Sequence, residues 1–158
     1  MIEGVSGPLV SHHYAERLLE SAFAGRLGER SRDRARRRIR TWWRGGGSRL
    51  GPSSALRSIF DVGAAPLVGL LGFSARQPRE AARGVLLLGE AVAGPLVVPL
   101  LVATWGTSLD SLWDTVARAS ARVEGAWALC FNGRSLRLCD ARPAFARGHG
   151  VAAAEWAL

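Results

Sequence analysis

The segment 126–147, AWALCFNGRSLRLCDARPAFAR, restricts the fold of this chain more than any other, because it has the pattern of a β-hairpin. Asn132 and Gly133 stand between two runs of β-prone residues, and an Asn-Gly pair favours a type I′ turn, in which both central residues have positive φ. The bulky apolar side chains of the two runs share one face, which we expect to belong to a hydrophobic core. That face would carry Trp127, Leu129, Phe131, Leu136 and Leu138.

The two cysteines of the chain fall on the opposite face of the same predicted hairpin. A two-residue turn places Cys130 opposite Ser135 and Cys139 opposite Ala126. The cysteines are then not cross-strand partners, and we expect no disulfide between them. With so few cysteines and no signal-peptide pattern at the N-terminus, the sequence indicates a cytoplasmic, reduced protein.

An apolar run over 84–105 must be tested as a membrane span, because its length suits a bilayer and Glu90 is its only charge. Glycines and prolines interrupt the run, and Ala-Gly-Pro at 93–95 predicts a turn that divides it into two strands, 85–92 and 96–104. Such nearly continuous apolar strands are typical of a sheet that is buried on both faces. We therefore expect two core strands and no membrane contact.

Four other segments have the apolar periodicity of helices. They span 11–25, 29–43, 53–71 and 107–125. Pro66 is expected to kink or divide the third helix, and Thr107 to Asp110 have the pattern of a capping box at the start of the fourth. Residues 76–83 are polar and predict a loop.

Helices that alternate with apolar strands indicate an α/β fold. We expect a three-layer sandwich, with a central mixed sheet and flanking helices, preceded by two N-terminal helices. The corresponding organisation is an arginine-rich helical extension over 1–50, an α/β domain over 51–147 and a tail over 148–158.

The formal charge of +8 is concentrated in one segment. All 21 basic residues are arginines, and ten of them lie between Arg26 and Arg49, where the only acids are Glu29 and Asp33. Such a concentration is typical of proteins that bind a polyanion, nucleic acid before a membrane surface, although a solvated basic helix would look the same. The predicted phosphate contacts are Arg36, Arg37, Arg38, Arg40 and Arg44.

Two further pairs of residues, a Trp pair and an Arg pair, could either bind nucleic acid or have a structural role. Trp42 and Trp43 could stack on an unpaired base, but a Trp pair at the end of a helix is more often part of a core. Arg134 and Arg137, at the tip of the hairpin, are the second set of predicted nucleic-acid contacts. Arg137 could instead pair with Asp140 or Asp114 and order the edge of the sheet.

Three segments, GPSSALRSIFDVGAAPLVGLLGF (51–73), VATWGTSLD (102–110) and WALCFNGRSLRLCDARPAFAR (127–147), together resemble the N-terminal region of bacterial restriction-modification and phage-defence enzymes. These enzymes are of the type II restriction–adenine methyltransferase fusion kind, in which a nuclease-like domain precedes a DNA methyltransferase. The NG-x-x-L-R-L turn also resembles the hairpin that closes the nuclease domain of type I restriction subunits. The likeness covers most of the chain and implies a restriction-nuclease core.

The resemblance also implies a catalytic site, with an acid at the head of one core strand and an acid-x-lysine pair on the next, which hold Mg²⁺ and activate water. In this sequence the second strand ends in Val-Ala-Thr at 102–104, which offers neither an acid nor a lysine. Glu90, Asp61 and Glu80 remain as isolated carboxylates. His12, His13 and His149 do not have the spacing of a metal site.

We therefore expect a catalytically degenerate nuclease-fold domain or subunit that has no activity of its own and needs no cofactor. Its expected partners are DNA and a DNA methyltransferase or helicase, either a separate subunit or a downstream domain, because the chain has no methyltransferase motifs. Two alternatives stay open. One is a divergent Mg²⁺-dependent endonuclease that uses Glu90 with Asp61 or Glu80, and the other is a scaffold whose arginine helix binds an acidic protein.

Overall fold

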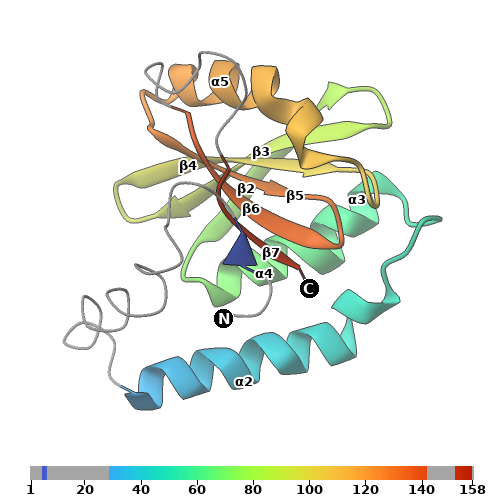
Figure 1. Ribbon diagram of the computed structural model, residues 1–158, viewed down its shortest axis with the longest axis vertical. Coiled ribbons are helices and arrows are strands. Elements are labelled where there is room, and N and C mark those ends of the chain that lie inside the picture. The colour runs from blue at the N-terminus through green and yellow to red at the C-terminus, as the bar shows by residue number, and fades with distance from the viewer. Residues whose placement is uncertain (1–4, 7–28, 142–151, 158) are drawn as a thin grey trace.

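A seven-stranded mixed sheet is the centre of the molecule, as the computed structural model shows (Figure 1). The structure describes residues 5–6, 29–141 and 152–157. The strands are β1 (Val5–Ser6), β2 (Ser74–Ala82), β3 (Leu86–Ala93), β4 (Leu96–Ala103), β5 (Trp127–Phe131), β6 (Ser135–Asp140) and β7 (Ala152–Ala157). The helices are α2 (Glu29–Gly45), α3 (Leu56–Ser58), α4 (Ala65–Leu70) and α5 (Trp113–Arg122), with 3₁₀ turns η2 (Gly47–Arg49) and η4 (Leu109–Leu112) and a π-helical segment η3 (Ile59–Ala64).

The strand order across the sheet is β1-β7-β6-β5-β4-β3-β2. Neighbouring strands are antiparallel except for β4 and β5, which are parallel and are joined through η4 and α5. A parallel pair needs such a crossover, because the chain must return to the same end of the sheet before the next strand begins. The mixed α/β class expected from the sequence is therefore confirmed.

Helices cover both faces of the sheet. The α3–η3–α4 helix lies on one face and α5 on the other (Figure 1). Along β4, Leu100 and Val102 point into the core beneath α4, whereas Leu101 and Ala103 point into the core beneath α5. The strand predicted over 96–104 is confirmed over Leu96–Ala103, and it is buried on both sides from Val98 onward, because successive side chains of a strand face opposite ways.

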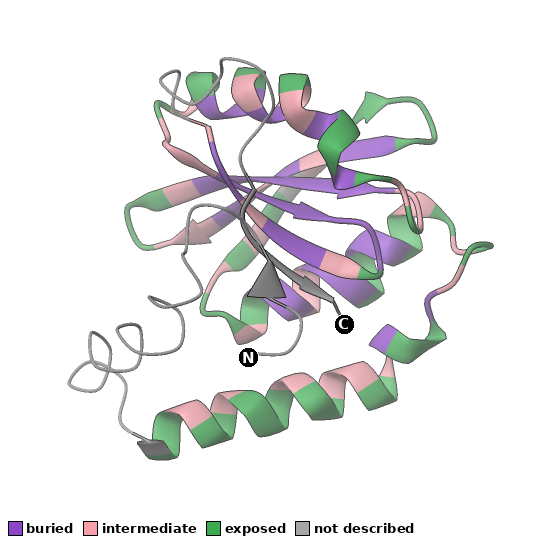
Figure 2. Cartoon of the chain, in the orientation of Figure 1, coloured by how far each residue is buried: buried purple, intermediate pink, exposed green. Residues whose placement is uncertain are grey.

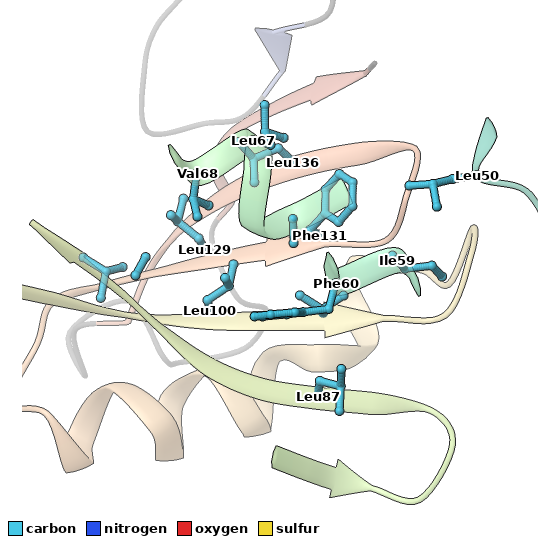
Figure 3. Packing of buried hydrophobic residues seen from close by; sticks show 14 residues of the cluster. Leu50, Ile59, Phe60, Leu67, Val68, Leu87, Leu100, Leu129, Phe131 and Leu136 are labelled. Atoms are coloured by element: carbon cyan, nitrogen blue, oxygen red, sulfur yellow. The ribbon is translucent and has the colours of Figure 1, made fainter. Parts of the chain in front are cut away.

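The core on the α4 side is the larger of the two (Figure 3). Ile59 and Phe60 of η3 and Val68 of α4 meet Leu100 of β4 and Phe131 of β5 there. Burying an aliphatic or aromatic side chain stabilises the fold by about 1.5–3 kcal/mol, so this contact fixes the helix against the sheet. Figure 2 shows the buried residues concentrated along the strands and on the inner sides of the helices.

The hairpin of β5 and β6 has the predicted faces but not the predicted register. Leu129 and Leu136 lie in the α4-side core as expected, but Phe131 pairs with Leu136, so each strand position is two residues from its predicted partner. Since the shift is an even number of residues, every side chain keeps its face. Cys130 lies opposite Arg137 rather than Ser135.

The cause of the changed register is the turn itself. Gly133 has φ +82°, but Asn132 does not have the positive φ that a type I′ turn requires. The side-chain Oδ1 of Asn132 instead accepts hydrogen bonds from the backbone N–H groups of Arg134 and Ser135, at 2.9 and 2.8 Å. Its Nδ2 donates to the carbonyl of Thr107 at 2.9 Å, which ties this turn to the loop after β4.

The predicted loop over 76–83 is wrong, because residues 76–82 belong to β2. Among the described strands β2 pairs only with β3, at the edge of the sheet, and register shifts interrupt it between Arg76 and Arg79 and between Glu80 and Ala82. Charges, a proline and bulges are common devices that protect an exposed edge from pairing with another chain. They also remove the alternation by which a strand is recognised in a sequence.

Pro66 does not divide the third predicted helix. α3, η3 and α4 follow one another without a break from Leu56 to Leu70, and the chain widens into a π-helical segment just before the proline. The N–H of Ala65 donates to the carbonyl of Phe60, five residues back. A π segment is a known way of accommodating a residue that disturbs α-helical pairing.

The other helices agree with the sequence in position and differ in detail. α2 covers the predicted 29–43, while the predicted helix over 11–25 lies outside the described residues. At the start of η4 the capping residue is Ser108, whose hydroxyl accepts from the N–H of Asp110, so the expected box with Thr107 is not formed. β7 pairs with β6, so residues in the expected tail join the same sheet.

Candidate nucleic-acid interface

α2 is strongly amphipathic in the structure. Eight arginines share this helix with Glu29 and Asp33. Ala35, Ile39 and Trp42 are half-buried. Figure 2 shows the half-buried positions of α2 on the side that faces the rest of the molecule. Arg32 and Trp43 are half-buried as well, and the other described side chains of α2, mainly arginines, are exposed.

All five arginines predicted as phosphate contacts are exposed on α2: Arg36, Arg37, Arg38, Arg40 and Arg44. Arg30 and Arg34 are exposed as well, and the sequence prediction missed them. The sequence pattern that could have revealed them is helical spacing. Arg30, Arg34 and Arg38 follow one another at intervals of four residues, which places them along one side of a helix. Within the part of the chain that the structure describes, the guanidinium groups of these seven arginines have no ion-pair partner.

The side chain of Trp42 joins α2 to the helix that covers the sheet. Its indole Nε1–H donates to the carbonyl of Val62 in η3 at 3.0 Å, and its ring packs against the α4-side core. In an α-helix this carbonyl would accept from the residue at position 66, which is a proline and has no N–H. The contact therefore satisfies a backbone acceptor that the sequence leaves without its usual donor.

The Trp pair consequently has a structural use. Trp42 and Trp43 lie 5.8 Å apart at their ring centroids and are inclined by 54°. Trp43 lies against Gly47, where a Cβ atom would overlap its ring. The contact between the two rings and the contact of Trp43 with Gly47 both lie where α2 meets η2. They favour a structural role for the Trp pair over stacking on a base.

The two arginines of the hairpin differ from each other. Arg134 is exposed, whereas the side chain of Arg137 is only 11% exposed. A nitrogen of Arg137 lies 2.6 Å from a carboxylate oxygen of Asp110, at the start of the crossover. This ion pair orders the sheet end, as the structural alternative for Arg137 expected, with Asp110 as a partner that the sequence did not suggest.

Of the three isolated carboxylates, Asp61 is separated from the other two by the sheet. Asp61 lies on the α4 side of the sheet, exposed and ion-paired with Arg57 at 2.9 Å. Glu90 is half-buried on β3, opposite Pro99, and lines a groove beneath α5 on the other face. Glu80 is exposed on β2 and lines a second groove beneath α5, which shares Arg79 and Arg122 with the groove of Glu90. Among the residues described, no group of three or more His, Cys, Asp or Glu side chains could hold a metal ion.

The end of β4, where the sequence resemblance led us to look for an acid-x-lysine pair, is closed in this structure. Val102 and Ala103 are fully buried, one on each face of the sheet, and Thr104 follows at the end of β4. The hydroxyl of Thr104 lies 2.7 Å from that of Thr107, in the loop that leads to η4. No described side chain in this strand can coordinate Mg²⁺ or stabilise a hydroxide.

The grooves on the two faces of the sheet differ in chemistry. Beneath α5 a groove of about 250 Å³ has Arg79, Arg118 and Arg122 together with Glu80 along its sides. On the other face a groove of about 420 Å³ is lined only by apolar residues of β4, β5 and β6 and of the chain after α4. Neither groove joins a nucleophile to a base, and α2 remains the surface with the clearest binding chemistry.

Fold and site together define a class: an α/β sandwich that carries an amphipathic, arginine-rich helix on the outside of one helical layer. No protein-family model, curated protein or solved structure matches this chain. None of the helices between residues 29 and 141 has the length and apolar character needed to cross a membrane.

Proposed function

We propose that this chain is a non-catalytic, DNA-binding and docking domain or subunit of a restriction-modification or phage-defence methyltransferase system. The observation that carries the proposal is the exposed side of α2, where seven arginines have no described ion-pair partner. Guanidinium groups bind phosphate oxygens through paired hydrogen bonds and are less strongly hydrated than ammonium groups. A helix with this charge is suited to the backbone of a nucleic acid.

The nuclease-like part of the proposal rests on element order and on the resemblance of the sequence. A helix, the meander β2–β3–β4, the crossover helix α5 and β5 follow one another as in a restriction-nuclease core. The proposal that catalysis has been lost rests on the closed end of β4 and on the separation of Asp61 and Glu90 by the sheet. Catalytic activity depends on the residues of the site and not on the fold, so a nuclease-like fold is compatible with a loss of catalysis.

A titration of duplex DNA by filter binding or fluorescence anisotropy at several salt concentrations tests the proposal. Binding should weaken steeply with salt, because each neutralised phosphate releases counterions and contributes about 0.9 to the slope of log K against log salt. Changing Arg36, Arg37 and Arg40 together to Ala should lower that slope by about 2–3.

The matched control removes exposed arginines from the opposite side of the molecule, Arg118 and Arg122 on α5. This variant should keep the slope of the unaltered protein. Binding that is absent, or that is insensitive to salt and to the α2 substitutions, would contradict the proposal. Salt-sensitive co-purification with a methyltransferase in the absence of DNA binding would instead support a protein scaffold.

A further inference from the structure

We propose that α2 binds duplex DNA by lying in the major groove, with arginines reaching the phosphates of both strands. This inference rests on the proposed function and adds to it the form of the nucleic acid and the way in which it is bound. It follows from how the arginines are distributed around the helix, and not from their number.

Successive residues of an α-helix are about 100° apart around its axis, which gives each side chain of α2 a direction. Ala35 and Ile39 mark the direction toward the rest of the protein, and both are half-buried. Arg30, Arg37 and Arg44 point the opposite way. The outermost line of the helix, which we call its crest, is therefore formed by these three arginines.

Two pairs of arginines lie on the sides of the helix between the crest and the packed face. Arg36 and Arg40 lie on one flank, and Arg34 and Arg38 lie on the other, each about 60–100° from the crest. All four are exposed, so neither flank is covered by the protein. The basic surface of α2 is thus a half-cylinder and not a flat stripe.

A half-cylinder of arginines matches a groove with charged walls. An α-helix with its side chains is about 10–12 Å across, and the major groove of B-DNA is about 12 Å wide, with a line of phosphates along each edge. A helix lying in it presents one flank to each strand and its crest to the base edges. On a flat polyanion, or on one single strand, only the crest and one flank can be in contact at a time.

The helix is also accessible for such a contact. α2 lies outside the sandwich, joined to it through Trp42 and packed against α4, and its exposed side faces away from the sheet (Figures 1 and 2). Asp33 lies near the start of the helix and, by its spacing, on the same flank as Arg36 and Arg40. The contact should therefore be centred on the stretch from Arg34 to Arg44.

Two flank variants test the inference in the full chain with a duplex of about 20 base pairs. Arg36→Ala with Arg40→Ala removes one flank, and Arg34→Ala with Arg38→Ala removes the other. In the major groove each pair neutralises phosphates of a different strand, so each variant should lower the salt slope by about 1.8. Methyl green, which occupies the major groove, should displace the protein, and netropsin, which occupies the minor groove, should not.

The outcomes separate the inference from the proposed function. If no salt-dependent binding of DNA is found, the proposed function fails. If DNA is bound but only one flank variant changes the slope, or only netropsin competes, DNA binding stands and the major-groove inference is overturned. Unchanged circular dichroism and thermal midpoints of both variants establish that the folded protein is being compared.

Discussion

Gly133 illustrates how one residue can meet two requirements at once. Its φ of +82° lies in the left-handed region, and a Cβ atom built on it would overlap the ring of Trp105. The left-handed conformation costs a non-glycine residue about 1–2 kcal/mol, and the overlap adds to that. The turn between β5 and β6 thus depends on glycine for its backbone and for the packing of the loop after β4.

We expect Gly133→Ala to lower the free energy of unfolding by more than about 2 kcal/mol, measured by urea denaturation. Gly84→Ala is the matched control, because Gly84 also has a positive φ, +67°, but no atom lies within 4 Å of the place that its Cβ would take. That control should cost about 1 kcal/mol. Equal losses at both positions would show that Trp105 does not restrict the turn.

The two cysteines form a buried contact that the predicted register did not provide. Their Sγ atoms are 3.8 Å apart, the two are not joined by a disulfide, and both side chains are buried beneath α5. The hydrogen bond with Cys139 and burial raise the pKa of Cys130 well above its ordinary value. The folded protein therefore holds the thiol proton more tightly than the unfolded chain does.

From this pKa we expect stability to fall as the pH rises above the ordinary pKa of a thiol, because the unfolded chain then releases a proton that the folded state retains. Urea midpoints at about pH 8 and about pH 10 measure the effect. The decrease should be smaller in Cys130→Ala, which has no thiol to titrate at that position. A decrease of the same size in both proteins would assign it to other groups.

At the level of elements, the joint between α2 and the core helix depends on Trp42 and Pro66 together. The residue that would donate to the carbonyl of Val62 in an α-helix is Pro66, which has no N–H. The indole N–H of Trp42 donates to this carbonyl instead. An intramolecular hydrogen bond contributes about 0.5–1.5 kcal/mol net. Such a contact fixes the direction of α2 without a large buried area.

We expect Trp42→Phe to destabilise the protein by about 1 kcal/mol or more, since it removes the indole N–H and some packing. In a Pro66→Ala background, residue 66 can donate to the Val62 carbonyl itself, so the same substitution should cost less. The double-mutant cycle, measured by chemical denaturation, gives the coupling between the two positions. Strictly additive costs would mean that the indole does not replace the missing donor.

The sequence predicts an element well when the element depends on neighbouring residues, and poorly when it depends on contacts with segments far away in the chain. The faces of the hairpin follow from a period of two and were predicted correctly, and the continuous apolar run of β4 correctly predicted burial on both faces. The register of the hairpin was not predicted, because Asn132 bonds to Thr107, 25 residues earlier in the chain. β2 was not predicted, because its charges and bulges hide the alternating pattern of a strand. These features suit an edge strand, and which strand forms the edge is decided only when the whole sheet assembles.

The candidate site shows the same limits. The concentration of arginines in one helix is local, so their exposure on α2 could be predicted. The pairing of Arg137 with Asp110 and the anchoring of Trp42 at Val62 could not, because each joins segments at least 20 residues apart.

For the whole molecule, the separation of acids by the sheet gives a prediction about catalysis. Asp61 and Glu90 lie on opposite faces, and the end of β4 has no acid, so we expect no Mg²⁺-dependent nicking of a supercoiled plasmid by the purified chain. The same preparation should still bind duplex DNA, which controls for its folding. Nicking that requires Mg²⁺ and is lost in Glu90→Gln would contradict the proposed loss of catalysis.

The order of strands across the sheet also has a kinetic consequence. From β2 to β7, each strand lies beside its neighbour in the sequence, whereas β1 joins the sheet by pairing Val5 with Trp156 and Ser6 with Glu155. Pairings between nearby segments close small loops and form quickly, while this one closes a loop over nearly the whole sequence. During synthesis the sheet can therefore assemble progressively from β2 onward, and β1, which leaves the ribosome before the other described strands, is the last to find its partner.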